Sequence, residues 1–172
     1  MAPTAGEALL AGPLVLSSWL STNAANLKPP VNNQCLYSGK DFILMAVGGP
    51  NTRSDYHGDM LLKIVENGSQ FRDVHIREGE MFLLPGNTPH SPIRYKDTVG
   101  LVMERTRPKE SIDQLQWYCP NKKAHGEEPV IIRHEQFYCE DIETQLKLVI
   151  DDWMSNEETR KCRECGQTAP PY

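Results

Sequence analysis

The sequence predicts a protein dominated by β-structure, an antiparallel sandwich or small barrel, with a short helix-containing extension at its C-terminal end. Three observations predict this class. Short apolar runs follow one another through the middle of the chain, Gly, Pro, Asn or Asp bounds each run, and turn signals such as Glu66-Asn67-Gly68 lie between them. The expected strands are residues 42–47, 60–65, 71–76, 81–85 and 99–104.

Length and composition limit the classes to which the chain can belong. Its 172 residues suffice for one domain with a substantial core, and a net charge of −5 argues against a general nucleic-acid binder. No apolar run approaches the ~20 residues that a membrane-spanning helix needs. The apolar stretch 8–20 lacks a preceding basic region and contains Gly12-Pro13, so we expect an N-terminal packing segment rather than a signal peptide.

The character of the chain changes after residue 108. Short β-like pieces alternate there with a polar loop, and apolar residues then recur at near-helical intervals, which predicts one amphipathic helix within residues 141–154. The apolar positions are Ile142, Leu146, Val149, Ile150 and Trp153. We expect residues 1–110 to form an N-terminal segment plus the barrel, and residues 111–172 to form an extension packed as part of the same domain.

The strongest local signal is the stretch GEMFLLPGNTPHSPIR, which has the pattern G-x5-P-x-N-x2-H. Gly79 opens an expected strand, Pro85 closes it without needing a ladder donor, and Asn87 tolerates the left-handed conformation of a tight turn. The turn would place His90 at the start of the next strand, pointing into the barrel. A lone histidine is more often an ordinary loop residue, but this setting favours a metal ligand.

This stretch closely resembles the second cupin motif. Together with GGPNTRSDYH, VMERTRP and WYC, it makes residues 28–165 similar to the 3-hydroxyanthranilate 3,4-dioxygenase family in its fungal form. The resemblance implies a cupin double-stranded β-helix, a jelly-roll barrel, followed by a short extension with a helix and a metal knuckle. It also implies a non-haem Fe(II) enzyme of the extradiol type, with 3-hydroxyanthranilate and O2 as its small-molecule partners.

The implied reaction opens the aromatic ring with O2. Its product, 2-amino-3-carboxymuconate semialdehyde, closes spontaneously to quinolinate, a precursor of NAD in the kynurenine pathway. We expect no nucleic-acid or membrane partner, and a homodimer is a possible assembly.

The resemblance assigns roles to five residues. His57 and His90 match the two iron histidines, and Arg53 matches the arginine beside the oxygen and substrate pocket. Arg94 matches the arginine that pairs with the substrate carboxylate, a task suited to guanidinium. Glu104 matches the glutamate that hydrogen-bonds the substrate, so Arg53 and Glu104 are the expected catalytic residues. Each charged residue alone would usually be a solvated surface group, and their joint presence at family positions favours function.

One expected ligand is missing. In the family, a loop and a strand that follow the DYH sequence hold the glutamate that is the third iron ligand, but this chain passes from His57 directly to GDMLLKIV. Asp59 is a candidate substitute for this ligand. A simpler explanation of its absence is a coding segment missing from the gene model. The alternatives to an active dioxygenase are a non-catalytic cupin that binds a small aromatic acid and a non-iron cupin such as an isomerase.

A second metal site is predicted near the C-terminus. Cys162 and Cys165 form a C-x-x-C knuckle, and Gly166 permits the sharp turn that directs backbone amides at the thiolates. Cys119 is the expected third ligand. Such a site would hold a structural zinc or a second iron; the alternative is a set of reduced free thiols.

The fourth ligand of this site is open. Lys122 stands where the family often has a second thiol, so His125 is the tentative choice and Cys139 the runner-up. Cys35 is expected to be a lone buried cysteine. Five cysteines with one C-x-x-C pattern favour metal over a disulfide framework, and we therefore expect a soluble, cytoplasmic protein.

Overall fold

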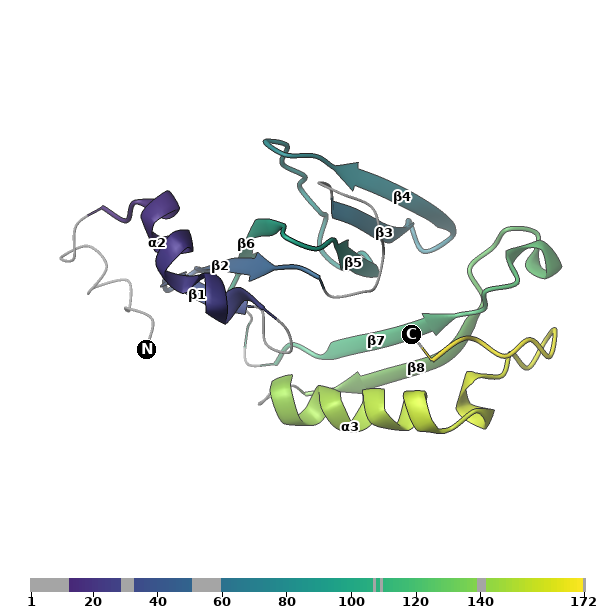
Figure 1. Ribbon diagram of the computed structural model, residues 1–172. Helices are drawn as coiled ribbons and strands as arrows, with labels where there is room; N and C mark the ends of the chain where they lie inside the picture. Colours follow the sequence, from purple (N-terminus) through teal and green to yellow (C-terminus); the bar gives the residue numbers. More distant parts are fainter. Residues whose placement is uncertain are drawn as a thin grey trace. The chain divides into compact units, whose positions relative to one another are not determined.

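The structure is a computed structural model that describes residues 13–28, 33–50, 60–106, 108, 110–138 and 142–171. Its strands form three sheets, which confirms the predicted β-dominated class (Figure 1). The chain divides into two compact units, Met1–Lys63 with Asp73–Leu83 and Ser91–Arg107, and Ile64–Arg72 with Leu84–His90 and Pro108–Tyr172. The expected division at residue 110, with both parts packed as one domain, stays a prediction.

The first sheet has the strand order β1-β2-β6, and both of its strand pairs are antiparallel. Its strands are β1 at Asn33–Ser38, β2 at Phe42–Gly48 and β6 at Val99–Arg105. Ala46 of β2 lies opposite Leu101 of β6. Strands β2 and β6 confirm two predicted strands, whereas β1 is not among those predicted.

The core of the first unit lies against β1 and β2. Leu27, Leu36 and Ala46 are buried together, and apolar side chains of helix α2 (Leu16–Asn23) pack against them. The 3-10 helix η1 (Ala24–Leu27) follows α2 directly. The apolar N-terminal stretch therefore packs against the core over its described part, as the sequence predicts.

Cys35 is exposed, which corrects the expectation of a lone buried cysteine. Successive side chains of a strand point to opposite faces, and the neighbouring Leu36 occupies the core position with 3% exposure. Residue type alone favours burial of a cysteine, but the register of β1 decides which of the two neighbours faces inward.

The second sheet has the strand order β4-β3-β5. Its strands are β3 at Met60–Glu66, β4 at Gln70–Ile76 and β5 at His90–Arg94. Asn67 and Gly68 join β3 to β4 with positive φ angles of 51° and 70°, the backbone conformation of a type I′ hairpin turn. Both predicted strands and the turn between them are confirmed.

Residues 81–85 do not form the strand that their apolar sequence predicts. Met81 and Leu83 are 95% and 90% exposed, so neither side chain gains the burial that would favour a strand. A strand also needs a hydrogen-bonding partner, and none of the described strands pairs with this segment. The prediction was wrong because the apolar sequence shows that the segment is compatible with a strand but does not show whether a partner strand is present.

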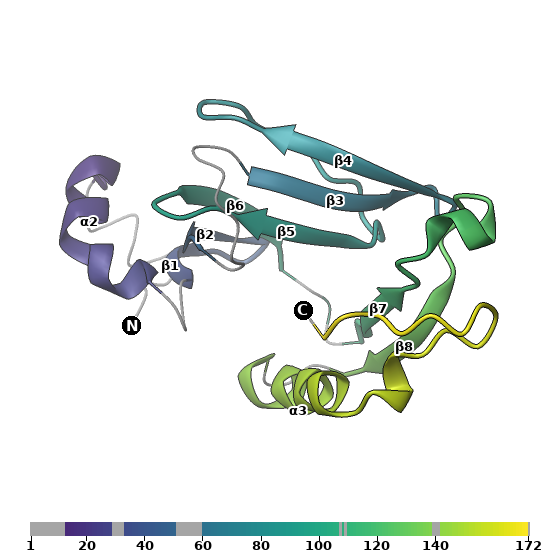
Figure 2. The same cartoon turned by 45° about the vertical axis from the view of Figure 1, so that its right-hand side comes forward.

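The second unit contains a two-stranded antiparallel sheet and a helix. Strand β7 (Asp113–Tyr118) pairs with β8 (Ile131–Phe137), and helix α3 (Ile142–Ser155) runs alongside them in both views (Figures 1 and 2). Trp117 of β7 stacks on Trp153 of α3 with ring centroids 4.8 Å apart. The predicted amphipathic helix is confirmed.

An ion-pair network links the same helix to β8. The Arg133 guanidinium donates to Asp152 Oδ2 at 2.6 Å and to Glu135 Oε1 at 2.7 Å. Because Arg133 is only 17% exposed, these hydrogen bonds order the surface around Trp117 more than an exposed pair would. The end of α3, and the chain that leaves it, is thereby held close to the hairpin.

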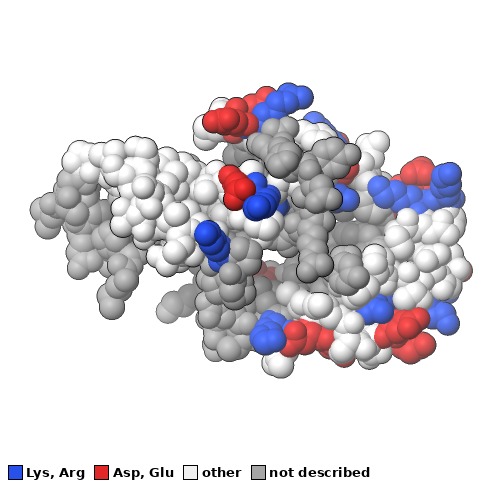
Figure 3. Space-filling model, in the orientation of Figure 1, with Lys and Arg blue, Asp and Glu red and all other residues white. Residues whose placement is uncertain are grey.

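Charged side chains of both signs lie next to one another on the face drawn in Figure 3. Arg72 pairs with Glu66 at 2.8 Å, and Arg77 pairs with Glu80 at 3.5 Å. Opposite charges at such distances cancel much of each other's field, so these residues contribute little net potential.

Candidate metal centre and active-site residues

The β7–β8 hairpin supplies two of the four residues predicted at the C-terminal metal site. Cys119 directly follows β7, and its N–H donates to the Val130 carbonyl at 2.8 Å, which holds it at the end of the sheet. His125 is the last residue of the 3-10 helix η2 (Lys122–His125). Asn121 caps this helix by accepting from the Ala124 N–H at 3.3 Å. A short local turn therefore brings Cys119 and His125 to the same side.

Lys122, where the sequence suggests a lost thiol, has a different contact. Its ammonium lies 4.3 Å from the centroid of the Phe71 ring, and Phe71 also meets Tyr118 edge to face at 5.5 Å. The lysine therefore contributes a cation–π contact that holds η2 in place.

The C-terminal turn supplies the other two residues. The Cys162 N–H donates to Gln167 O at 2.8 Å, the Gly166 N–H donates to Cys162 O at 2.9 Å, and Gly166 has a positive φ of 73°. Position 166 thus needs the left-handed conformation that glycine adopts without strain. The turn has the knuckle form that its C-x-x-C-G sequence predicts.

Arg160 anchors this turn to helix α3. Its guanidinium donates to the carbonyls of Trp153, Met154 and Ala169 at 3.1, 2.8 and 3.1 Å. The carbonyls at a helix C-terminus lack partners within the helix, so a guanidinium that bridges them to a later segment fixes where the segment starts.

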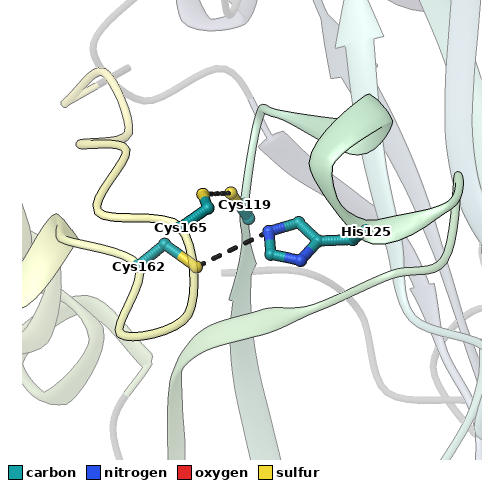
Figure 4. Close-up of side chains that lie close together, drawn as sticks. All are labelled: Cys119, His125, Cys162 and Cys165. Atoms are coloured by element: carbon teal, nitrogen blue, oxygen red, sulfur yellow. Dashed lines mark hydrogen bonds between the residues drawn. The ribbon is translucent and has the colours of Figure 1, made fainter.

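The four side chains converge on one point (Figure 4). One ligand atom from each of Cys119, His125, Cys162 and Cys165 lies within 4.8 Å of every other. Cys119 Sγ is 3.6 Å from Cys165 Sγ, too long for a disulfide bond. Cys162 Sγ is 3.7 Å from His125 Nε2. A tetrahedral zinc with metal–sulfur bonds of ~2.3 Å places two sulfurs about 3.8 Å apart, and a sulfur and a nitrogen about 3.6 Å apart.

Burial and nearby backbone N–H groups determine how easily the cysteine thiols of this cluster ionise. Cys119 and Cys162 are 3% and 2% exposed, and the His125 side chain is 4% exposed. Backbone N–H groups, first that of Cys165 and then that of Glu164, hold the pKa of Cys162 down to about 7. Burial, partly offset by the Asn121 N–H, raises the pKa of Cys119 to about 11. The metal-free site thus contains one thiol that ionises easily and one that needs a cation to ionise at neutral pH.

Glu164 is a site residue that the sequence reasoning missed. Its Oε2 lies 3.2 Å from His125 Nδ1, on the side of the ring opposite to the sulfurs. It lies between the two cysteines of the knuckle, but its contact with His125 joins two turns that are distant in the sequence, so the sequence alone does not indicate it. Cys139, the alternative fourth ligand, lies outside the described residues.

His90 begins β5, as its motif predicts. Asn87 has a positive φ of 58°, and the Pro89 carbonyl accepts from the Val65 N–H at 2.9 Å, so the turn before His90 is tied to β3. His90 Nδ1 lies 2.9 Å from the Thr88 carbonyl, which can only accept, so Nδ1 is the donor. The ring is exposed, and Nε2 is then the nitrogen that can bind a metal.

The remaining predicted active-site residues are placed only in part. Arg94, at the end of β5, is half-buried, and burial lowers the pKa of its guanidinium. Glu104 lies on β6 opposite Ile43 and is exposed. Arg53, His57 and Asp59 lie outside the described residues. The predicted meeting of His57 with His90 across the barrel therefore stays a prediction.

Antiparallel sheets with a histidine at the start of a strand, after a cupin-type turn, are features of a cupin-type β protein. Residues 9–154 match the family model described as 3-hydroxyanthranilic acid dioxygenase. The chain belongs to the 3-hydroxyanthranilic acid dioxygenase family.

Individual relatives agree with the family match. A protein of Aspergillus oryzae named 3-hydroxyanthranilate 3,4-dioxygenase 2 is 54% identical over 92% of this chain and 98% of its own length. Proteins of Mycosarcoma maydis and Neurospora crassa named 3-hydroxyanthranilate 3,4-dioxygenase are 51% and 47% identical, over 91% and 94% of this chain and 93% and 92% of theirs.

The lengths of these alignments carry further information. The alignment with the Aspergillus oryzae protein spans 177 residues, more than the 172 of the whole chain. An alignment can exceed the length of a chain only where the relative has residues with no counterpart in it. The relative thus contains sequence that this chain lacks, which is what a missing segment after His57 requires.

Among the described residues, none of the helices has the length and apolarity that a membrane crossing demands.

Proposed function

We propose that the protein opens the aromatic ring of 3-hydroxyanthranilate with O2. The observation that carries the proposal is the family match over residues 9–154. The relatives at about half identity, named as 3-hydroxyanthranilate 3,4-dioxygenases, support it. The product would be 2-amino-3-carboxymuconate semialdehyde, and its closure to quinolinate would place the reaction in the supply of NAD.

In this proposal His57 and His90 hold a ferrous ion. The hydrogen bond from His90 Nδ1 to the Thr88 carbonyl fits this role, because it orients the ring and leaves Nε2 for a metal. Iron, when bound, would supply an acidic centre with open positions for the substrate and O2. The chain's own residues bind and orient the organic acid.

Arg94 is proposed to pair with the substrate carboxylate, and Arg53 and Glu104 to contact its other polar groups. The half-buried position of Arg94 suits this task, because a guanidinium with little competing water forms stronger charge-assisted hydrogen bonds. The Glu104 carboxylate would accept a hydrogen bond from the amine or hydroxyl group of the substrate ring and could hold the proton of that group.

The same proposal includes an impaired iron site. Two histidines without the family's glutamate leave the ion under-coordinated and its charge poorly compensated, unless Asp59 supplies the missing carboxylate. We therefore expect weak retention of Fe(II) and slow or absent turnover. Anaerobic titration with Fe(II), followed by substrate and O2, tests this, with the semialdehyde measured by absorbance and chromatography. Turnover by the iron-loaded chain supports the dioxygenase, and substrate binding without turnover supports the alternative below.

The alternative function is a non-catalytic cupin that binds a small aromatic acid. The feature that favours it is the absence of a residue matching the family's iron-binding glutamate after His57. Calorimetric titration with 3-hydroxyanthranilate under nitrogen, in the parent and in Arg94→Lys, measures acid binding without reaction. A binder should bind with or without iron, and Arg94→Lys should weaken it because lysine cannot make the bidentate pair.

We further propose that Cys119, His125, Cys162 and Cys165 hold a structural zinc ion. Four closely spaced donors, three of them sulfur, form the closed tetrahedral set typical of such sites. Elemental analysis should find one zinc per chain in addition to any iron. Cys162→Ser should remove it, and Cys35→Ser, at an exposed cysteine of β1, should not. Iron in place of zinc would identify the second-iron alternative.

A further inference from the structure

Glu164 contacts the one ligand of the metal centre that can choose between two tautomers. The carboxylate Oε2 lies 3.2 Å from His125 Nδ1, and the other ring nitrogen, Nε2, lies 3.7 Å from Cys162 Sγ. The ring is almost fully enclosed, with 4% exposure, while the Glu164 side chain is 65% exposed. The two nitrogens of His125 therefore meet different environments, a carboxylate on one side and sulfur on the other.

We propose that Glu164 is a positioning residue that fixes His125 with its proton on Nδ1 and its lone pair on Nε2 directed at the metal. The inference rests on the proposed metal site. A neutral imidazole offers a metal only the nitrogen that carries no proton, so the partner of the other nitrogen selects the ligand atom. A carboxylate accepts a hydrogen bond and cannot donate one, so the proton of the neutral ring stays on Nδ1.

The backbone of the same residue serves the site a second time. The Glu164 N–H is one of the groups that stabilise the Cys162 thiolate. One residue of the knuckle would thus support a sulfur ligand through its main chain and the nitrogen ligand through its side chain. Substitution of the side chain leaves the main-chain hydrogen bond in place, so a variant isolates the contribution of the carboxylate.

The position of Glu164 also accounts for how a histidine serves in a knuckle site. A thiolate has no tautomers, whereas a histidine in that position needs an acceptor behind it. The Glu164 side chain extends from the knuckle loop to Nδ1 of the His125 ring, and its carboxylate meets that need. The two residues form one unit, and loss of the carboxylate should affect His125 more than the three cysteines.

The test compares the parent chain with Glu164→Ala, Glu164→Gln and Glu157→Ala. Glu157 is an exposed glutamate of the same C-terminal segment that is not a member of the cluster, and it serves as the matched control. Zinc affinity is measured by competition with a chromophoric chelator, and the His125 tautomer by long-range 1H–15N correlation. We expect Glu164→Ala to weaken zinc binding by about 10–100-fold. Glu164→Gln, whose amide oxygen still accepts, should fall between it and the parent.

The tautomer measurement separates positioning from a general effect on folding. In the parent, His125 should carry its proton on Nδ1 with and without zinc, and in metal-free Glu164→Ala the proton should be shared between the two nitrogens. Equal zinc affinity and an unchanged tautomer in Glu164→Ala would overturn the inference and leave the metal site standing. A parent chain that takes up no zinc would remove the metal site and the inference together.

Discussion

His125 ends the 3-10 helix η2 and His90 begins strand β5, and the two histidines differ in what surrounds the second ring nitrogen. In each, Nδ1 contacts an oxygen acceptor, a carboxylate at 3.2 Å for His125 and the Thr88 carbonyl at 2.9 Å for His90. The His125 side chain is buried in a cluster with three cysteines, with Nε2 at 3.7 Å from Cys162 Sγ, whereas His90 is exposed. His125 thus lies in a cluster of four possible metal ligands, whereas His90 is one possible ligand whose Nδ1 already has a hydrogen-bond partner.

The comparison shows how local turns contribute to a metal site. The cysteine site draws its donors from two short pieces of chain, each shaped by its own turn, so local hydrogen bonds determine most of its geometry. The proposed iron site draws on His57 and His90, and the family resemblance implies a third ligand, a glutamate, for which the sequence after His57 offers no match. On this proposal, the absence of that glutamate leaves the cysteine site complete and removes one donor from the iron site.

The largest expected effect is at the assembled site. Cys162→Ser should abolish stoichiometric zinc and lower the free energy of unfolding by about 4 kcal/mol, the contribution of a ligand present at about 1,000 times its dissociation constant. Denaturant unfolding followed by Trp fluorescence is a suitable measurement, since Trp117 and Trp153 stack in the same unit. Cys35→Ser should unfold like the parent, and equal loss in both variants would contradict a local metal contribution.

The next effect concerns the iron site. Inserting after His57 the segment of the Aspergillus oryzae relative that has no counterpart here should raise Fe(II) affinity by about 10–100-fold or more and restore turnover. The same insert with its iron-binding glutamate replaced by alanine is the control, because it restores the chain length without the ligand. Stoichiometric iron and fast turnover in the unmodified chain would go against the proposal, and Asp59→Ala would then identify the substitute ligand.

A smaller effect is expected from pH at the cysteine site. The pKa of Cys162 is lowered to about 7 and that of Cys119 is raised to about 11, so at neutral pH the metal must displace the Cys119 proton. Affinity for zinc should therefore rise with pH, by up to about tenfold per pH unit for each proton released. Calorimetry in buffers of different ionisation enthalpy counts these protons. Affinity that stays constant between about pH 6 and pH 8 would show that the thiols are already ionised.

The sequence predicts well what depends on neighbours in the chain. The turn at Asn67-Gly68 and the knuckle at 162–166 follow from residues that must adopt positive φ, and both have that conformation in the structure. Features that depend on distant partners are less predictable. The alternation of residues 81–85 predicts a strand without showing whether a neighbour exists, and the residue type of Cys35 predicts burial without showing its register in β1.

Glu164 illustrates a different limit of sequence reasoning. An acidic residue between two cysteines reads as a solvated charge, and its side chain is indeed 65% exposed. Its contact with His125 follows from the fold of two turns together, which no pattern in either turn describes. Arg53 and His57 lie outside the described residues, so the arrangement of the proposed iron site stays a prediction.

The smallest expected effect tests the segment that precedes His90. Leu83 is 90% exposed, so Leu83→Ala should change the free energy of unfolding by less than about 0.5 kcal/mol in the present chain. Leu62→Ala, at a β3 position that is 5% exposed, should cost about 2–5 kcal/mol and serves as the buried control. If the inserted segment forms a strand beside residues 81–85, Leu83→Ala should become costly in the insertion variant. A Leu83→Ala cost that is the same with and without the insert would mean that the restored ligand acts without rebuilding a strand there.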